Sequence, residues 1–143
     1  MARPVMLSNG QLMVGLNEAG LVHDFYYPYV GLDNLTTARS VHHKIGIWAD
    51  GDFSWVDDDG WQTHVDLETD ALIGTVELIN ESLGIAIHTK DFVDSQTNAL
   101  IRRLHVTNLR DQSRDVRLFM HQVFEISRSG RADQLGISGR TAA

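Results

Sequence analysis

The chain has 143 residues, of which 43% are hydrophobic, so it is long enough for about one globular domain with a buried core. Its 12 lysines and arginines against 19 aspartates and glutamates give a formal net charge of −7, which argues against nucleic acid or an anionic membrane surface as a partner. There is no cysteine, which excludes disulfides and thiolate chemistry, and no apolar run approaches the length of a membrane span. The first residues lack the apolar segment of a signal peptide, so we expect a cytoplasmic location.

Short segments of alternating polarity, separated by turn signals, predict β-strands along most of the chain. Beyond short strands at the start, the expected strands cover residues 12–16, 21–27, 44–49, 53–55, 61–67, 73–79, 85–93, 99–106 and 116–126. Between two of them, Asp50 and Gly51 form a typical type I′ hairpin turn. No segment has a sustained helical period, and about ten strands joined by short turns favour an all-β antiparallel sandwich over a βαβ fold.

The composition changes at Ser127, where the sequence becomes rich in glycine, serine, arginine and alanine. Such a segment has little apolar surface to bury and contains no convincing strand. We therefore expect a β-sandwich over residues 1–126 and a loop or disordered tail over residues 127–143.

The most distinctive stretch is HDFYYPYVGLDNL, at residues 23–35. Because Pro28 cannot donate to a sheet, the preceding strand should end near Tyr27. Tyrosine has an apolar body and a polar tip, which suits a surface packed against a sugar or another domain. A corner packed into the core is the alternative, and chemistry alone favours it, because most aromatic clusters are packing. The candidate substrate-edge or domain-interface residues are His23, Tyr26, Tyr27, Pro28 and Tyr29.

Two groups of residues suggest metal binding, but neither has the spacing that a metal site requires. The aspartates at 57–59 carry the oxygen ligands that calcium prefers, but a solvated hairpin tip explains them better than an EF-hand does. Among the seven histidines, His88, His105 and His121 lie on consecutive expected strands and could approach one another on one face. Scattered surface histidines are the favoured interpretation, since no HExxH spacing is present. We expect no metal and no cofactor.

Glycoside hydrolysis needs two carboxyl groups that face each other across a sugar, roughly 5–9.5 Å apart. Asp24 lies beside the tyrosines but has no obvious acidic partner. Asp91 and Asp94 flank an expected strand end, where turn capping explains both. No nucleophile elbow, P-loop or dinucleotide fingerprint is present, so we assign no catalytic residue within this chain.

The three tryptophans, Trp48, Trp55 and Trp61, lie around one expected hairpin. Aligned on one flat face, they could stack on pyranose rings. Their mixed strand parity instead predicts that they are divided between core and surface.

Three longer blocks of sequence stand at residues 3–34, 46–61 and 98–126. They read RPVMLSNGQLMVGLNEAGLVHDFYYPYVGLDN, GIWADGDFSWVDDDGW and NALIRRLHVTNLRDQSRDVRLFMHQVFEI. In this order and spacing they resemble the beginning of glycoside hydrolase family fifteen, which includes bacterial and archaeal glucoamylases, glucodextranases and glucoamylase-like trehalases. The resemblance covers residues 3–131, and it is the combination of the blocks that makes it specific.

The resemblance implies an N-terminal β-supersandwich that precedes an (α/α)6-barrel catalytic domain. In the family, an inverting reaction uses two glutamates of the barrel, and no position of this chain matches either of them. The family's sandwich is longer than this chain, so the resemblance implies an incomplete sandwich. The sequence QLGISGRTAA after Asp133 also departs from the family, which predicts a truncated or split product.

We therefore expect a non-catalytic N-terminal region of a glucoamylase-like glycoside hydrolase that acts on α-glucosides such as starch, maltooligosaccharides, dextran or trehalose. Its expected partners are the catalytic barrel, in the same chain or a neighbouring one, and an α-glucan or trehalose. An incomplete sandwich also has an unpaired strand edge, which predicts self-association. Two other functions stay open: a free-standing carbohydrate-binding module, and a β-sandwich interaction domain without affinity for sugar.

Overall fold

The computed structural model describes residues 3–36 and 43–124, and within these ranges it contains ten strands and no helix. The strands are β1 (Val5–Ser8), β2 (Met13–Leu16), β3 (Val22–Tyr26), β4 (Lys44–Ala49), β5 (Asp52–Trp55), β6 (Gln62–Leu67), β7 (Gly74–Asn80), β8 (Ile85–Val93), β9 (Leu100–Asn108) and β10 (Val116–His121). They pair in antiparallel fashion into sheets of order β1–β2–β3, β10–β4–β5 and β6–β7–β8–β9. The predicted tail at residues 127–143 and the end of the last expected strand lie outside the described residues, so the division at residue 126 stays a prediction.

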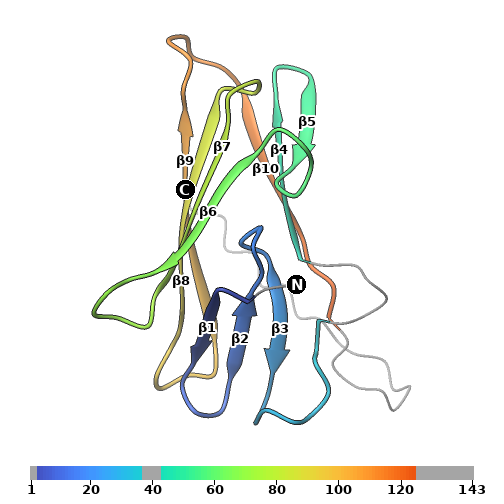
Figure 1. The fold of residues 1–143 in the computed structure, drawn as a ribbon. Helices are drawn as coiled ribbons and strands as arrows, with labels where there is room; N and C mark the ends of the chain where they lie inside the picture. The colour runs from blue at the N-terminus through green and yellow to red at the C-terminus, as the bar shows by residue number, and fades with distance from the viewer. Residues whose placement is uncertain (1–2, 37–42, 125–143) are drawn as a thin grey trace, which may run out of the picture.

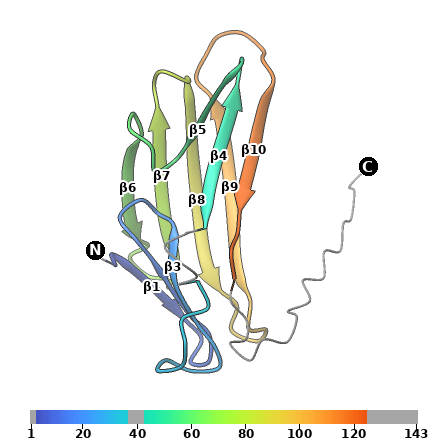
Figure 2. The ribbon, with the colours of Figure 1, turned by 90° about the vertical axis from the view of Figure 1, so that its right-hand side faces the viewer.

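The sheets form two layers, and this confirms the prediction of an all-β antiparallel sandwich. The four-stranded sheet β6–β9 is one layer, and the two three-stranded sheets lie end to end against it as the other (Figure 1; Figure 2). Strand β1 contacts β6, β7 and β8 across the interface. Among the described residues, no helix is long and apolar enough to cross a membrane.

Alternation of side chains explains how the core forms. In β7 and β8, every second residue is buried, and Val76, Leu78, Ile85 and Ile87 fill the interface between the layers. Full burial of such a side chain contributes about 1.5–3 kcal/mol, so the inward-facing rows of the sheets are the main stabilising feature. Fully buried leucine, isoleucine and valine side chains of β1, β2 and β4 complete the same core.

Most strand predictions agree with the structure to within one or two residues, and the 50–51 turn has positive φ at both positions, as a type I′ turn requires. The last strand is the exception. It was expected to continue to residue 126, but β10 ends at His121, and residues 122–124 are not in a strand. The reason lies in its partner: β4 begins at Lys44, directly opposite His121, and the preceding residue, His43, is not in a strand, so the ladder between the two strands ends there.

One side of the sandwich is open, because β9 and β10 are edge strands of the two layers on the same side (Figure 2). Leu118 and Met120 of β10 lie opposite the buried Ile47 and Ile45 of β4, so they belong to the inner face. They are nevertheless 42% and 47% exposed. Within residues 3–36 and 43–124, an apolar inner face is therefore uncovered between β9 and β10, and the candidate site is located there.

Candidate functional site

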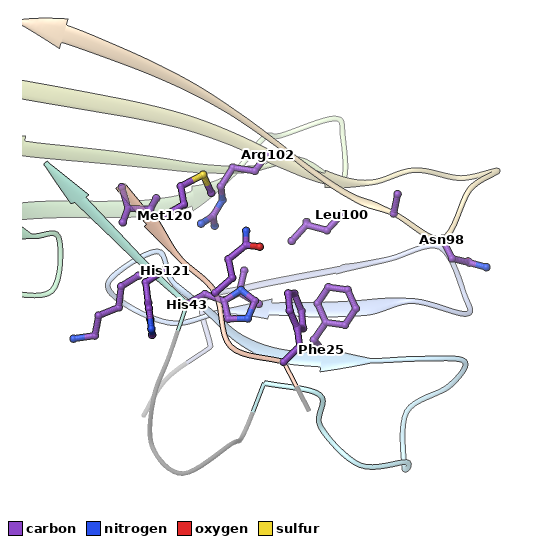
Figure 3. Close-up of a pocket in the computed structure, with 13 residues that line it drawn as sticks. Phe25, His43, Asn98, Leu100, Arg102, Met120 and His121 are labelled. Carbon is purple, nitrogen blue, oxygen red and sulfur yellow. The ribbon is translucent and has the colours of Figure 1, made fainter. Parts of the chain in front are cut away.

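A cleft of about 330 Å³ occupies the open side, between β3, β4, β9 and β10 (Figure 3). Its walls combine apolar side chains with imidazole, amide and guanidinium groups. Residues that line it include Phe25, His43, Leu100, Arg102, Met120 and His121. The described residues around the cleft include no aspartate or glutamate, so they cannot provide the facing carboxylates that glycoside hydrolysis requires.

Arg102 is held in the wall of the cleft by an ion pair with Asp91, its direct partner across β8 and β9. Its Nε lies 2.6 Å from Oδ1 of Asp91, and its Nη2 lies 3.0 Å from Oδ2. Asp91 is fully buried and accepts a further hydrogen bond from the hydroxyl of Thr89. Arg102 also donates to the carbonyl oxygen of Gly20, which ties β9 to the turn before β3. The prediction that Asp91 caps a turn is therefore wrong, because the residue lies on the inner face of β8.

Asp94, by contrast, caps the turn that follows β8, as predicted. Its Oδ1 accepts hydrogen bonds from the backbone N–H groups of Gln96 and Thr97, at 2.8 and 2.6 Å, and from the hydroxyl of Thr97. These donors, with the backbone N–H of Thr97 first and that of Gln96 second, lower the pKa of Asp94 below its ordinary value.

An aromatic wall closes the cleft where β10 leaves its sheet. The His43 and Phe124 rings meet edge to face with centroids 4.4 Å apart, and Phe25 and Phe124 do so at 5.7 Å. The His43 Nε2 also hydrogen-bonds to the carbonyl oxygen of Val123, at 3.0 Å. Sequence reasoning did not single out this wall. Its members are far apart in the chain, and no local pattern links them.

The tyrosine corner, which we define as residues 26–29, lies at the end of β3. This strand stops at Tyr26, close to the predicted position. Tyr27 and Tyr29 are 46% and 59% exposed, whereas His23 and Tyr26 are half-buried. The two outer rings are therefore not packed into the core, contrary to the interpretation that chemistry alone favoured. Pro28 is also exposed.

Asn34 fastens the end of this loop to β3. Its Oδ1 accepts from the backbone N–H of Phe25 at 3.0 Å, and its Nδ2 donates to the carbonyl oxygen of His23 at 3.1 Å and to Oδ1 of Asp24 at 3.0 Å. Thr36 donates to the same His23 carbonyl at 2.7 Å. Because both ends of the loop are held in this way, its exposed rings project from a fixed base.

Asp24 has a structural role in this arrangement. It is buried, pairs with Nε of Arg3, and accepts the bond from Asn34. The nearest nitrogen of His23 is 3.4 Å from the Asp24 carboxylate. A Cβ atom on Gly15 would come within 2.8 Å of Oδ2 of Asp24, so this buried network also requires a glycine on the neighbouring strand.

The candidate metal ligands do not converge. His88 and His105 are direct neighbours across β8 and β9, but His121 lies on β10, in another sheet. No group of three or more potential metal ligands is formed by the described part of the chain. At the 57–59 turn, Oδ2 of Asp58 accepts from the backbone N–H of Trp55 at 2.7 Å, and Asp57 pairs with Lys44 at 2.7 Å. The three aspartates are exposed, as predicted, but the turn is not a hairpin tip, because β5 and β6 belong to different sheets and the turn crosses from one layer to the other.

The tryptophans are divided between surface and core, as their parity predicted. Trp48 and Trp55 share the outer face of the β10–β4–β5 sheet, while Trp61 packs against the core. On the outer face, the Phe53 ring meets Trp55 and Phe119 edge to face, with interplanar angles of 88° and 79°. These side chains form a self-packed cluster rather than a row of coplanar rings.

The fold and the cleft define an all-β protein whose sandwich is open on one side, and sequence similarity relates this protein to glycoside hydrolases. The chain is 28% identical over 124 residues to a protein of Methanocaldococcus jannaschii that is named "Uncharacterized glycosyl hydrolase MJ1610". The aligned segment is 85% of this chain but 18% of that relative. No family model and no solved structure matches the chain.

Proposed function

We propose that this chain is a non-catalytic β-sandwich region of a larger glycoside hydrolase that acts on α-glucosides. In this proposal it supports a separate (α/α)6 catalytic barrel, in the same polypeptide or in a neighbouring one. The main observation in support of this proposal is the uncovered inner face beside the cleft. A second, independent support is the similarity to a protein named as a glycosyl hydrolase. The aligned segment is only 18% of that relative's length, as expected if this chain corresponds to one part of a larger protein.

The uncovered face supports a partner because monomeric proteins rarely leave large contiguous apolar patches in water. Full burial of a leucine or methionine is worth about 1.5–3 kcal/mol, so covering the exposed halves of Leu118 and Met120 contributes about 1 kcal/mol each. The free backbone groups along β9 and β10 add to this tendency, since an edge strand readily pairs with a further strand.

The tyrosine corner is proposed as the part of the domain interface nearest to substrate. Its outer rings are exposed, and the Asn34 hydrogen bonds fix the loop from which they project. Such rings, with an apolar body and a polar hydroxyl, suit a surface that packs on another domain or on sugar. In a full-length homologue, Tyr27→Ala and Tyr29→Ala should change activity or domain docking more than the melting temperature of the sandwich. Loss of stability with unchanged kinetics would contradict this role.

The carbohydrate-binding module is the second candidate, and the aromatic cluster on the outer face of β4 and β5 is the observation in its favour. Its edge-to-face packing weakens this candidate, because a pyranose ring stacks on an exposed aromatic face. In addition, the guanidinium of Arg117 lies 4.8 Å above the Trp48 ring.

One experiment separates these functions. The chain is mixed with a separately produced (α/α)6 barrel of a family-fifteen enzyme, and complex formation is measured by size-exclusion chromatography with light scattering. If the chain supports a barrel, the two proteins should form a complex, and Leu118→Glu should disrupt it. Gln62→Glu is the matched control, since it adds the same charge at an exposed position of the distant edge strand β6.

Each other outcome points to a different function. Retention of the chain alone on immobilised starch would favour the module, and neither complex nor retention would favour an interaction domain without sugar affinity. Release of glucose from maltotriose or trehalose by the chain alone would contradict the non-catalytic role.

A further inference from the structure

Four basic side chains lie together on the outer face of β8 and β9, away from the cleft. They form two directly opposed pairs, His88 with His105 and Lys90 with Arg103. Among the residues that the structure describes, these four line a surface hollow of about 200 Å³. Because successive pairs on one face of a sheet are neighbours, the four side chains form one compact basic block.

The block is electrostatically unfavourable in isolation. Like charges directly opposite each other on neighbouring strands destabilise a sheet, and Lys90 and Arg103 form such a pair on this sheet face, beside the two facing imidazoles. Lys90 is compensated by Glu68, whose Oε1 lies 2.5 Å from its Nζ, and His88 has Glu77 opposite it on β7. Neither acid lies opposite Arg103, whose partner across the strands is Lys90.

Arg103 differs from the other cations of the chain. Over residues 3–36 and 43–124, it is the one lysine or arginine whose side chain makes neither a hydrogen bond nor an ion pair. Its guanidinium offers five N–H donors in a planar arrangement that fits the oxygens of a phosphate or a carboxylate. Arg103 is exposed, so these donors are accessible to an anionic ligand from solution.

We propose that this block is a binding site for a phosphate group. Arg103 would donate two hydrogen bonds to its oxygens, while His88 and His105 donate from their ring nitrogens and Lys90 adds charge. The size of the hollow favours a small group, since pockets for drug-sized ligands occupy roughly 300–1,000 Å³. The site does not depend on the proposed support of a barrel, because it lies on the opposite face of the sheet from the core.

Two alternative ligands fit the surroundings less well. A metal cation would be bound by His88 and His105 but repelled by Arg103 and Lys90 beside them. A nucleic acid needs a long basic track, whereas acidic residues on β6 and β7, including Glu77, limit this patch to the width of two strands.

The test is a titration of the full chain with inorganic phosphate, followed by NMR at pH 6.0 and constant ionic strength. Histidine side chains in general carry part of a positive charge at this pH. We expect saturable shifts centred on Arg103, His88 and His105. Arg103→Gln should weaken binding at least about tenfold, because it removes a charge-assisted pair of hydrogen bonds. Arg117→Gln is the matched control, since Arg117 is an exposed arginine on the other layer that already pairs with Asp115.

Unsaturable shifts, equal shifts near every arginine, or equal binding by Arg103→Gln and the native chain would overturn the proposal. If Arg103→Gln fails to fold, the double variant His88→Gln/His105→Gln provides the same comparison. Titrations with glucose 6-phosphate and with glucose then distinguish a free phosphate from a phosphate carried by a sugar. Binding of glucose alone at this position would count against a phosphate site.

Discussion

Replacing Arg102 by methionine tests how much the buried ion pair between β8 and β9 in the cleft wall stabilises the fold. The substitution keeps an unbranched chain of similar length but removes the guanidinium that contacts Asp91 at 2.6 and 3.0 Å. It also removes the hydrogen bond to Gly20, which connects β9 with the first sheet. Asp91 would keep its bond from Thr89 and would be left buried without a cation.

The expected loss follows from this burial. Removing one partner of a buried ion pair costs about 3–5 kcal/mol, because the remaining charge has lost its solvation without compensation. This is a large share of the roughly 5–15 kcal/mol that stabilises a typical domain. Arg117→Met is the control: Arg117 and Asp115 are each 63% exposed, so breaking their pair should cost about 0.2–1 kcal/mol, and losing the contact with the Trp48 ring about 0.5–1 kcal/mol more.

Urea unfolding at pH 7, followed by tryptophan fluorescence, measures these differences in the free energy of unfolding. A double variant, Asp91→Leu/Arg102→Met, should recover most of the loss, since a buried ion pair replaced by apolar residues is often neutral. A loss below about 1 kcal/mol for Arg102→Met would refute the reasoning. Equal instability of the double and single variants would also refute it, because the loss of stability could not then come from an unpaired Asp91.

Three further predictions concern the loop, the open side and the turn after β8. Asn34→Ala should speed amide hydrogen exchange at residues 26–33, because three hydrogen bonds that hold the loop are removed, and unchanged exchange there would contradict a clamp. The chain should self-associate through its open side, and Leu118→Gln should weaken this in sedimentation runs over a range of concentrations; a compact native monomer at every concentration would contradict it. Asp94→Asn should lower stability at pH 7. Because folding lowers the pKa of Asp94, its stabilisation is present at neutral pH and lost as the pH falls through that lowered value, so the variant and native unfolding curves should converge in strong acid.

The strands could be predicted from sequence because alternation of polar and apolar residues is a local signal. In β7 and β8 the buried residues are those that the pattern places on one face. The sheet order could not be predicted in this way. Strand β10 pairs with β4, about seventy residues earlier in the chain, and no local pattern identifies that partner. The length of β10 was wrong for the same reason, since it is set by where β4 begins.

The candidate site, like the sheet order, could be predicted from sequence only where its residues are neighbours in the chain. The aromatic corner at Tyr27 and Tyr29 was recognised because its residues are consecutive. The clamp by Asn34 and the pairing of Asp91 with Arg102 were missed, because each joins residues about ten positions apart across a turn. One signal was present in the sequence: Arg102 shares its strand face with Leu100 and Leu104, and an arginine on an apolar face requires an acidic partner.

Arg102 and Arg103 are consecutive residues of the same type, and the structure gives them opposite environments. Strand parity turns Arg102 inward, where Asp91 neutralises it, and turns Arg103 outward, where Lys90 is its partner across the strands. Substitution of Arg102 should therefore lower stability, while substitution of Arg103 should change phosphate binding and leave stability nearly unaltered. A shift of β9 by one residue would exchange the two roles, so the paired substitutions also test the register on which both the cleft and the basic block depend.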